Sequence, residues 1–412
     1  MKARTGRLSV PGVSKVQDSK NSGGRPTVAR VVAPTFGLDD PSALESQRLG
    51  KFDVRLVRAP KLGSDPYPLG PPGTEAAADP SRWFGMAGSP GPDPGLPLKA
   101  LCERALRNEG IRLVHADCGA TAPMASRIRR AYKLPLVVSF AGSDVRLCSE
   151  SRRGVATYQG IFRDAFAVTA GSEFVMEKLL EANCPAKKII QLRRGVDLDR
   201  YRYTPREPVR GRNVRFLFVG DLTQTSGIEM TIRSFAEVHE VERLTELQVV
   251  GDGALRSAMQ DLVCELGLTD AISLRGVQSL AATREAMYAS DLFVLPLRTG
   301  DDDSFRPCPT ALIQAQATGL PAISTLHAEV PEFITHGQAG LLCNERDVAG
   351  LAGNMLWMVK HSDVWADMGW AGHARMFENH DIRRCSRRLE SIYSAALTAA
   401  AIGRKPGNPT YQ

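Results

Sequence analysis

Residues 306–332 read RPCPTALIQAQATGLPAISTLHAEVPE, and this stretch decides the fold of the chain. Pro309 suits the first turn of a helix, where its missing N–H costs nothing. The pattern predicts a helix over 310–318 that ends at Gly319, then a buried strand and a loop that ends at Glu332. The first turn of such a helix offers free N–H groups and a positive dipole end, which would bind a phosphate group. An ordinary amphipathic helix after a loop explains the same geometry at least as well.

Length and composition allow two domains of ordinary size. The chain has 412 residues, of which 43% are hydrophobic, so it can bury two cores. It contains no run of about 18 apolar residues, so no membrane span is predicted. Of the net charge of +7, a net +5 lies in residues 1–27, which contain six basic residues and one acidic residue, Asp18. The remaining chain is nearly neutral, which argues against nucleic acid as a partner.

The N-terminal tail and the cysteines favour a cytoplasmic protein. Residues 1–27 are rich in Ser, Gly and basic residues and lack the apolar core of a signal peptide, so we expect a disordered tail. A transit peptide is a weaker alternative, because the tail has no clear amphipathic helix. Eight cysteines and seven histidines are scattered without metal-ligand or C-x-x-C spacing. The chain is therefore expected to use no metal and no cofactor, and to keep its thiols reduced.

Strand and helix patterns alternate along the chain, which is typical of parallel sheets covered on both faces. We expect a first domain over 28–203 and a second over 204–379, because residues 204–213 are polar, contain proline and lack a regular pattern. Residues 59–97, with GPPG and GSPGPDPG, cannot form regular structure; a functional loop and a disordered insertion are about equally favoured. The expected secondary structure includes a helix over 99–108 and strands over 28–32, 52–57, 111–115, 136–140, 166–170, 214–219, 247–250, 272–274 and 292–295.

In the second half of the chain, buried strands end in glycine-containing loops. Gly220, Gly251 and Gly276 each follow such a strand. Ligands in open α/β sheets bind at the carboxyl ends of the strands. Each fragment alone is a weak signal, because glycine after a strand usually makes a turn. Their order and spacing together indicate a binding edge.

The stretch 306–332 resembles the donor-site signature of retaining, family-four glycosyltransferases with the GT-B fold. That signature reads E-G-x-P-x-x-L-x-E-A-x-A-x-G-x-P-V, followed by a strand and G-x-P-E. The sequence from Ser324 to His327 most resembles that of the exopolysaccharide, colanic-acid-like branch. Residues 188–201 resemble the family's strand that leads into the motif N-G-V-D-x-x-x-F. The shared signature positions are Pro309, Leu312, Ala315, Ala317, Gly319, Pro321, Pro331 and Glu332.

The resemblance covers residues 135–395 well and the first hundred residues poorly. It implies an α/β protein with two Rossmann-like domains that face each other across a cleft. It also implies a closing helix over 380–399 that crosses back onto the first domain, followed by a tail over 400–412. The substrates implied are a nucleotide-sugar donor and a saccharide or lipid-linked acceptor in surface polysaccharide assembly.

Several polar positions depart from the family pattern. The two signature glutamates fall on Arg306 and Gln314, and the glycine of G-x-P-E falls on Glu329. Gln314 can still hydrogen-bond a ribose, whereas Arg306 reverses a charge. The Arg and Lys of the family's G-R-L-x-x-x-K-G loop, which hold the diphosphate, fall on Asp221 and Ser226.

These departures weaken the expected charge complementarity. A carboxylate at Asp221 would cost on the order of 1–4 kcal/mol at about 4 Å from a phosphate. The histidine of the family's F-H-G-x-D element falls on Ala141, although Gly142 and Asp144 persist. The H-F-G element is matched loosely by residues 117–119.

The resemblance assigns residues to the two substrates. Arg306, Asp144 and Asp117 are the predicted catalytic residues, with the two aspartates facing the acceptor. Val277 is expected near the base. The predicted donor-binding residues are Gly220, Asp221, Ser226, Gly227, Gly251, Val277, Pro309, Thr310, Ala311, Gln314 and Glu332.

Two interpretations of this pattern stay open. In the first, Arg306 takes over diphosphate binding as a bidentate donor and the run 301–303 supplies the lost carboxylate, although a solvated loop explains that run better. In the second, the protein is a catalytically silent relative that binds a ligand or pairs with an active glycosyltransferase. The basic tail could also contact the inner face of a membrane.

Other classes have less support. A carbohydrate-binding module would need an exposed aromatic platform, but aromatics make up only 6% of the chain and Trp83-Phe84 is the sole adjacent aromatic pair with Trp. A hydride-transferring enzyme would need G-x-G-x-x-G after its first strand, and residues 35–38 do not match it.

Overall fold

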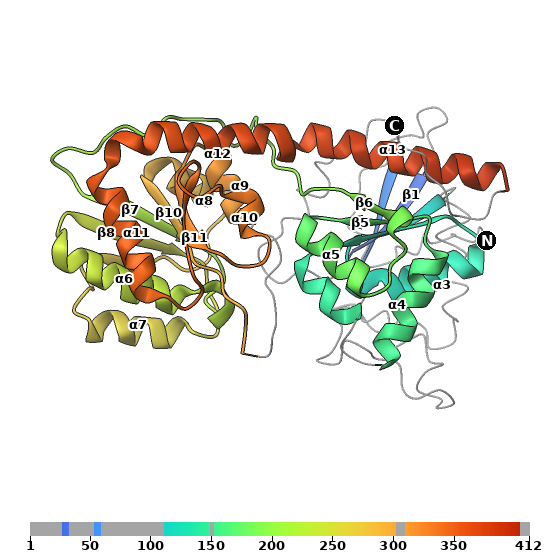
Figure 1. Cartoon of the computed structure of the whole chain (residues 1–412), viewed down its shortest axis with the longest axis horizontal. Helices are drawn as coiled ribbons and strands as arrows, with labels where there is room; N and C mark the ends of the chain where they lie inside the picture. Colours follow the sequence, from blue (N-terminus) through green and yellow to red (C-terminus); the bar gives the residue numbers. More distant parts are fainter. Residues whose placement is uncertain (1–26, 33–52, 59–110, 149–151, 302–309, 404–412) are drawn as a thin grey trace, which may run out of the picture.

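The computed structural model of the chain describes residues 27–32, 53–58, 111–148, 152–301 and 310–403. The predicted tail 1–27 lies outside these residues except for its last position. The predicted loop 59–97, the predicted helix 99–108 and residues 404–412 of the predicted tail 400–412 also lie outside them. The described part forms two α/β lobes, with two successive helices running along both (Figure 1). The predicted α/β architecture of two parallel-sheet domains is confirmed.

The first lobe contains six parallel strands in the order β2-β1-β3-β4-β5-β6. The strand order reverses between β1 and β3, and ligands of open α/β sheets bind at the carboxyl ends of the strands at such a point. The strands are β1 Thr27–Val32, β2 Asp53–Arg58, β3 Ile111–Ala116, β4 Leu136–Phe140, β5 Ala167–Ala170 and β6 Ile189–Gln191. The helical segments are η3 Gly119–Thr121, α3 Ala122–Tyr132, η4 Gly142–Cys148, α4 Arg152–Asp164, α5 Glu173–Glu181 and η5 Ala186–Lys188.

The second lobe repeats this plan with the strand order β12-β11-β10-β7-β8-β9. Its strands are β7 Val214–Val219, β8 Thr245–Val250, β9 Ile272–Leu274, β10 Leu292–Leu295, β11 Ala322–Thr325 and β12 Gly340–Cys343. Its helical segments are η6 Gln224–Ser226, α6 Ile228–Val241, α7 Arg256–Glu265, α8 Leu280–Ala289, α9 Thr310–Ala317, α10 Val330–Phe333, α11 Val348–Lys360 and η7 Ser362–Val364.

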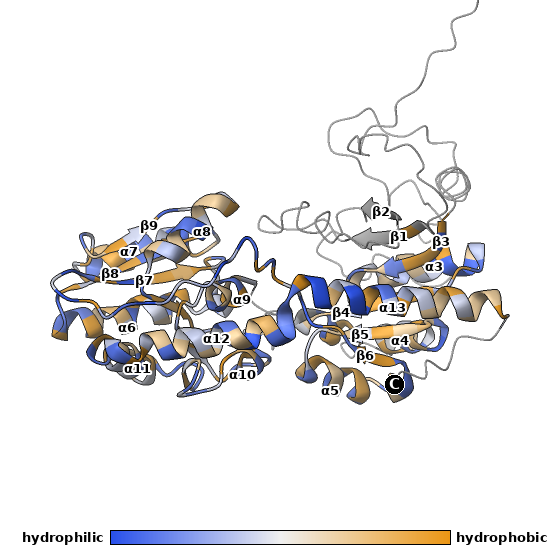
Figure 2. Ribbon diagram, turned by 90° about the horizontal axis from the view of Figure 1, so that it is seen from above, coloured by the Kyte–Doolittle hydropathy of each residue, from blue (hydrophilic) through white to orange (hydrophobic). Residues whose placement is uncertain are grey.

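Continuous apolar runs explain why these strands lie in the middle of each lobe. In β7, Phe216, Leu217 and Phe218 are all fully buried, as expected for a parallel strand covered on both faces. The strands of the second lobe are mostly hydrophobic, whereas the surrounding helices mix both characters (Figure 2). The predicted strand 52–57 is found one residue later, and the predicted helix 310–318 ends one residue earlier.

Two consecutive helices connect the lobes. α12 Trp365–His380 contacts α9 in the second lobe, and α13 Ile382–Ala401 contacts β3 and β4 in the first. Both run along one side of the molecule in the two views (Figures 1 and 2). None of the helices in the described ranges is long and apolar enough to cross a membrane.

A buried polar chain holds α13 on the first sheet. The Tyr393 hydroxyl lies 2.6 Å from His115 Nδ1, and His115 Nε2 lies 2.8 Å from the Ser139 hydroxyl. Ser139 is in turn 2.7 Å from the Thr169 hydroxyl. One chain of hydrogen bonds thus joins α13, β3, β4 and β5, and it is expensive to break because His115, Thr169 and Tyr393 are buried.

Candidate active site between the two lobes

Loops at the carboxyl ends of both sheets meet between the lobes, and Glu332 of α10 joins them. Its two carboxylate oxygens accept hydrogen bonds from the backbone N–H groups of Glu173 at 3.0 Å and Phe174 at 3.1 Å. These groups form the first turn of α5 in the opposite lobe, where the helix dipole favours a negative charge. Arg375 holds the Glu332 loop by donating to the backbone oxygen of Glu332 at 2.6 Å. The structure therefore places Glu332 as a clamp between the lobes, while its predicted contact with a donor stays a prediction.

Arg194 makes a second contact across the lobes. It follows β6 in the first lobe, and its Nη1 donates to the Thr310 hydroxyl at 2.7 Å. Thr310 is the first residue of α9, so a guanidinium lies at a helix N-terminus, where free N–H groups already favour anions. In the N-G-V-D pattern of the family, an asparagine stands where this chain has Arg194.

His380 fixes the backbone of Arg194. Its Nδ1 lies 2.8 Å from the Arg194 carbonyl oxygen, which can only accept, so Nδ1 must carry a proton. Burial lowers the pKa of His380 to about 4. The ring is therefore neutral near pH 7 and acts as a fixed hydrogen-bond donor.

Glu329 enters the same region from the loop after β11. Its side chain is 2% exposed, and neither carboxylate oxygen has a hydrogen-bond partner among the described residues. Burial, and then the charge of Glu332, raise the pKa of Glu329 to about 7. The Ser172 hydroxyl, Arg194 and the Gly142 N–H lower its pKa, although neither Ser172 nor Gly142 makes a well-formed hydrogen bond to the carboxylate.

Asp144 is enclosed within the first lobe. Its carboxylate accepts from the Ala141 N–H at 3.0 Å, and the N–H groups of Gly119 and Ala120 in the loop after β3 also act to lower its pKa. Burial is the main reason that the pKa of Asp144 rises to about 6, and Asp117 adds to the effect. Asp144 thus holds the loops after β3 and β4 together. This geometry favours a structural role over the predicted contact with an acceptor.

Asp117, the other predicted first-lobe residue, lies half-buried directly after β3. It therefore stands at the carboxyl edge, as expected. The neighbouring Cys118 is not a candidate nucleophile, because burial raises the pKa of its thiol to about 12 and leaves it un-ionised near pH 7.

In the second lobe, Ser226 does not offer its side chain to the cleft. It is fully buried, and its hydroxyl donates to the Thr223 carbonyl oxygen at 2.8 Å. The hydroxyl is also 3.4 Å from the Thr223 N–H, which completes a capping box around η6. The hydroxyl thus serves to close its own turn, and a donor contact of Ser226 stays a prediction.

The predicted glycines of the second lobe are required by close packing of the loops. Gly227 has a φ of 70°, and a Cβ there would lie 1.9 Å from the Pro296 carbonyl oxygen. Gly251 has a φ of 139°, and its Cβ would lie 1.9 Å from the Gly220 carbonyl oxygen. The loops after β7, β8 and β10 can therefore approach each other only through glycine. Donor contacts of Gly220, Gly227 and Gly251 stay predictions.

The remaining predicted donor residues occupy varied positions. Val277 is 60% exposed and follows Gly276 in the loop after β9. Ala311 and Gln314 are half-buried on α9, and Asp221 is half-buried after β7. Arg306 and Pro309 lie outside the described residues.

The acidic run 301–303 gives little support to the first interpretation. Arg298 and Arg346 lie 2.7 Å and 3.0 Å from the Asp301 carboxylate. Asp302 and Asp303 lie outside the described residues. The one described member of the run is therefore engaged by two cations of its own lobe.

The sequence prediction missed the groups that cross between the lobes. Arg194 could have been found from its place in the N-G-V-D pattern, and Glu329 had been noted only as a departure from it. His380 carried no sequence signal, because its role depends on a carbonyl group 186 residues earlier in the chain.

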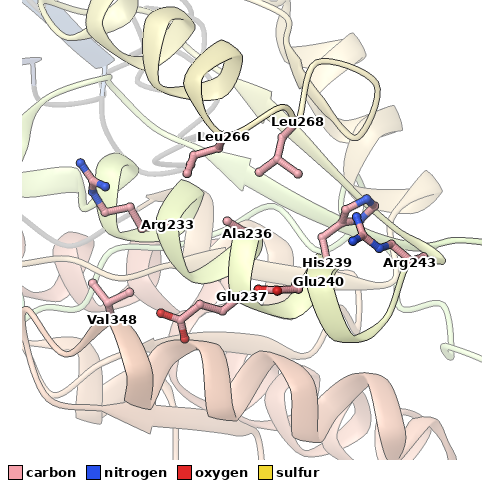
Figure 3. A pocket seen from close by; sticks show the side chains of 9 residues that line it. All are labelled: Arg233, Ala236, Glu237, His239, Glu240, Arg243, Leu266, Leu268 and Val348. Carbon is pink, nitrogen blue, oxygen red and sulfur yellow. The ribbon is translucent and has the colours of Figure 1, made fainter.

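A surface groove of about 460 Å³ lies elsewhere, on the outer side of α6 (Figure 3). It contains none of the predicted site residues, and its lining mixes both charges with leucine and valine side chains. Its residues are Arg233, Ala236, Glu237, His239, Glu240, Arg243, Leu266, Leu268 and Val348. Within the described ranges, no group of three or more His, Cys, Asp or Glu side chains is placed to hold a metal ion.

Both lobes of the chain are similar to known proteins. Residues 29–195 match the family described as "Glycosyl transferase 4-like domain", and residues 213–361 match "Glycosyl transferases group 1". A putative colanic acid biosynthesis glycosyltransferase from Salmonella typhimurium is 26% identical over 63% of this chain and 64% of its own length. The amylovoran biosynthesis glycosyltransferase of Erwinia amylovora is 27% identical over 60% of each chain. The chain thus matches less than two thirds of the length of these relatives.

Solved structures share the fold. Sucrose-phosphate synthase from Thermosynechococcus elongatus superposes with a TM-score of 0.67 at 17% identity, over 91% of this chain and all of that one. An Anabaena protein, HepE, solved with UDP and glucose, also has a TM-score of 0.67, at 14% identity over 90% of this chain and 100% of its own. The two domain matches follow one another in the order of the two lobes, so this chain has the GT-B fold, with a match to a glycosyl transferase 4-like domain followed by a match to a glycosyl transferases group 1 domain.

Proposed function

We propose that this protein transfers a sugar from a nucleotide-sugar donor to a saccharide or lipid-linked acceptor during assembly of a surface polysaccharide, and that its donor site has been rewired. The observation that carries the proposal is the hydrogen bond from Arg194 to Thr310. It brings a cation to the N-terminus of α9, in a family whose usual cations fall here on Asp221 and Ser226. The names of the colanic acid and amylovoran relatives support the pathway class.

The chemistry requires stabilisation of a departing diphosphate. In the transfer, the bond between the anomeric carbon and the phosphate oxygen breaks, and a bond to an acceptor hydroxyl oxygen forms. The hydroxyl proton leaves with the phosphate. Preorganised donors aimed at the developing charge supply most of the barrier reduction in such reactions. Arg194 and the first N–H groups of α9 would be those donors, and the proposal includes no metal ion.

The lobes themselves would respond to the donor. Glu332 binds the first turn of α5, and Arg194 binds Thr310, so both contacts report how closely the two cleft edges approach. A diphosphate at α9 would exchange the neutral Thr310 hydroxyl for a charged acceptor, which makes a stronger hydrogen bond with a guanidinium. Donor binding should therefore strengthen the contact between the lobes.

The test is a panel of nucleotide sugars together with the corresponding nucleoside diphosphates. Thermal stabilisation measures binding, and nucleotide release in the presence of saccharide acceptors measures transfer. We expect at least one nucleotide sugar to raise the melting temperature and to be turned over. The absence of stabilisation by every nucleotide would contradict a donor site.

A silent relative is the second candidate, and a specific observation favours it. Ala141 offers only a methyl group where the family has a histidine, and Ser226 uses its hydroxyl within its own turn. In this case nucleotide sugars would bind without release of the nucleotide. The protein would then act as a ligand-binding partner of an active glycosyltransferase, peripheral to the inner face of the membrane.

A further inference from the structure

Glu329, in the loop after β11, is an unusual group for a protein interior. It is 2% exposed, and both of its carboxylate oxygens are without a hydrogen-bond partner among the described residues. Burial of a carboxyl group without hydrogen bonds is costly. Native proteins keep such groups rarely, and then usually for a functional reason.

The loop that carries Glu329 is held on both sides. On one side, His327 Nδ1 lies 2.7 Å from Glu345 Oε1, and Glu345 also accepts from the Thr299 N–H at 2.7 Å. On the other side, Glu332 is bound to the first turn of α5. The position of Glu329 is therefore set by two anchors and does not result from a loosely placed loop.

Backbone strain accompanies this placement. Ala328 has a φ of 41°, in the left-handed region that costs a residue with a Cβ on the order of 1–2 kcal/mol. Strain of this kind concentrates at functional sites, where the surrounding structure enforces it. The strained residue directly precedes the buried carboxylate.

The surroundings of Glu329 select the kind of ligand that could satisfy it. Gly142 and Ser172 are each the second residue after β4 and β5 in the first lobe, and Arg194 follows β6. Glu332 is the second carboxylate nearby and repels a further negative charge. A phosphate group is therefore excluded from this position, whereas neutral hydroxyl groups can donate to both oxygens.

We propose that Glu329 is a sugar-binding residue whose carboxylate accepts hydrogen bonds from the hydroxyl groups of the donor's sugar between the lobes. This inference rests on the proposed function. The diphosphate would lie at Arg194 and the start of α9, and the sugar directly attached to it would reach Glu329. The carboxylate would thereby recognise the sugar hydroxyl groups near Ala141, which has no polar side chain.

The proposal is tested by the affinity ratio between a nucleotide sugar and its nucleoside diphosphate. The wild type should bind the nucleotide sugar more tightly. Glu329→Gln and Glu329→Gly should reduce this advantage by about 10-fold or more, as expected when a hydrogen bond to a charged group is lost, and should leave the affinity for the diphosphate within about two-fold. Glu265→Gln, an exposed glutamate on α7, serves as the matched control and should change neither affinity.

The pH dependence gives a second readout. Because the pKa of Glu329 is raised to about 7, the wild-type advantage for the nucleotide sugar should grow between pH 6 and pH 8, and should stay flat in Glu329→Gln. An unchanged affinity ratio in a folded Glu329→Gln variant would overturn this inference but not the proposed function. A wild type that binds the diphosphate and the nucleotide sugar equally well would do the same, whereas a wild type that binds no nucleotide would overturn the proposed function as well.

Discussion

At the scale of single residues, the charged side chains of the candidate site stand at other positions than in the family pattern. Asp221 and Ser226 occupy the places of two family cations, and Arg194 brings a cation to α9 from the other lobe. Glu329 brings a carboxylate where the family has glycine. Charged groups at the cleft therefore appear at new positions rather than disappear.

Arg194→Ala should weaken binding of a nucleoside diphosphate roughly 10- to 100-fold, because a charge-assisted hydrogen bond is lost. Isothermal titration at fixed ionic strength measures the change. Arg194→Lys should recover part of the affinity, since a lysine keeps the charge but not the planar geometry. Arg210→Ala, an exposed arginine of the segment before β7, is the control. Equal affinities of the wild type and Arg194→Ala would refute the assigned role.

Glu329→Gln should stabilise the free protein at alkaline pH. The folded-state pKa of about 7 lies above the ordinary value of 4.5, so the contribution of Glu329 to stability is lost as the pH rises through 7. Glutamine cannot ionise, and the variant should be more stable than the wild type at pH 8 by up to roughly 3 kcal/mol. The difference should shrink toward pH 4.5. Denaturant melts at both pH values measure it, and a pH-independent difference would speak against the buried, unpartnered carboxylate.

At the scale of elements, the glycine loops of the second lobe interlock. Gly227 approaches Pro296, and Gly251 approaches Gly220, in each case with no room for a Cβ. Sequence order alone predicted that these loops share one edge, because parallel strands end on the same side of a sheet. It could not predict that the Ser226 hydroxyl would donate a hydrogen bond to the Thr223 carbonyl oxygen, since turn geometry decides that contact.

Gly251→Ala should destabilise the second lobe by roughly 2–4 kcal/mol, because its Cβ would meet the Gly220 carbonyl oxygen in a strained backbone conformation. Gly353→Ala is the matched control. It lies exposed within α11, where a Cβ would meet nothing within 4 Å, so alanine should be neutral or stabilise by up to about 1 kcal/mol. Thermal unfolding of the two variants compares them, and equal melting temperatures would contradict the close approach of the loops.

At the scale of the whole molecule, α13 ties the C-terminal part of the chain to the first sheet. Leu389, Ile392 and Tyr393 pack with Val28 and Leu113 in one apolar cluster. The Tyr393 hydroxyl joins the buried chain through His115. The relative placement of the cleft edges therefore depends on a helix that follows the second lobe in sequence.

Tyr393→Phe should cost roughly 1–3 kcal/mol, because it removes a hydroxyl from a buried hydrogen bond to His115. Hydrogen exchange should show the loss in β3 and α13 and spare the strands of the second lobe. Ser394→Ala, on the exposed side of the same helix, should have little effect. Uniform loss of protection in both lobes would indicate that α13 is not anchored in this way.

The sequence by itself determined the two parallel sheets and the family signature, because both depend on local patterns: apolar strands, glycine turns, and the proline and alanine framework of residues 306–332. Only the tertiary structure decided which charges meet. Arg194 and Thr310 are 116 residues apart, and Glu332 binds a helix 158 residues earlier in the chain. Such contacts exist because α13 returns to the first sheet and brings two cleft edges together. No local pattern encodes that approach, so the role of Glu329, buried between the lobes, became visible only in three dimensions.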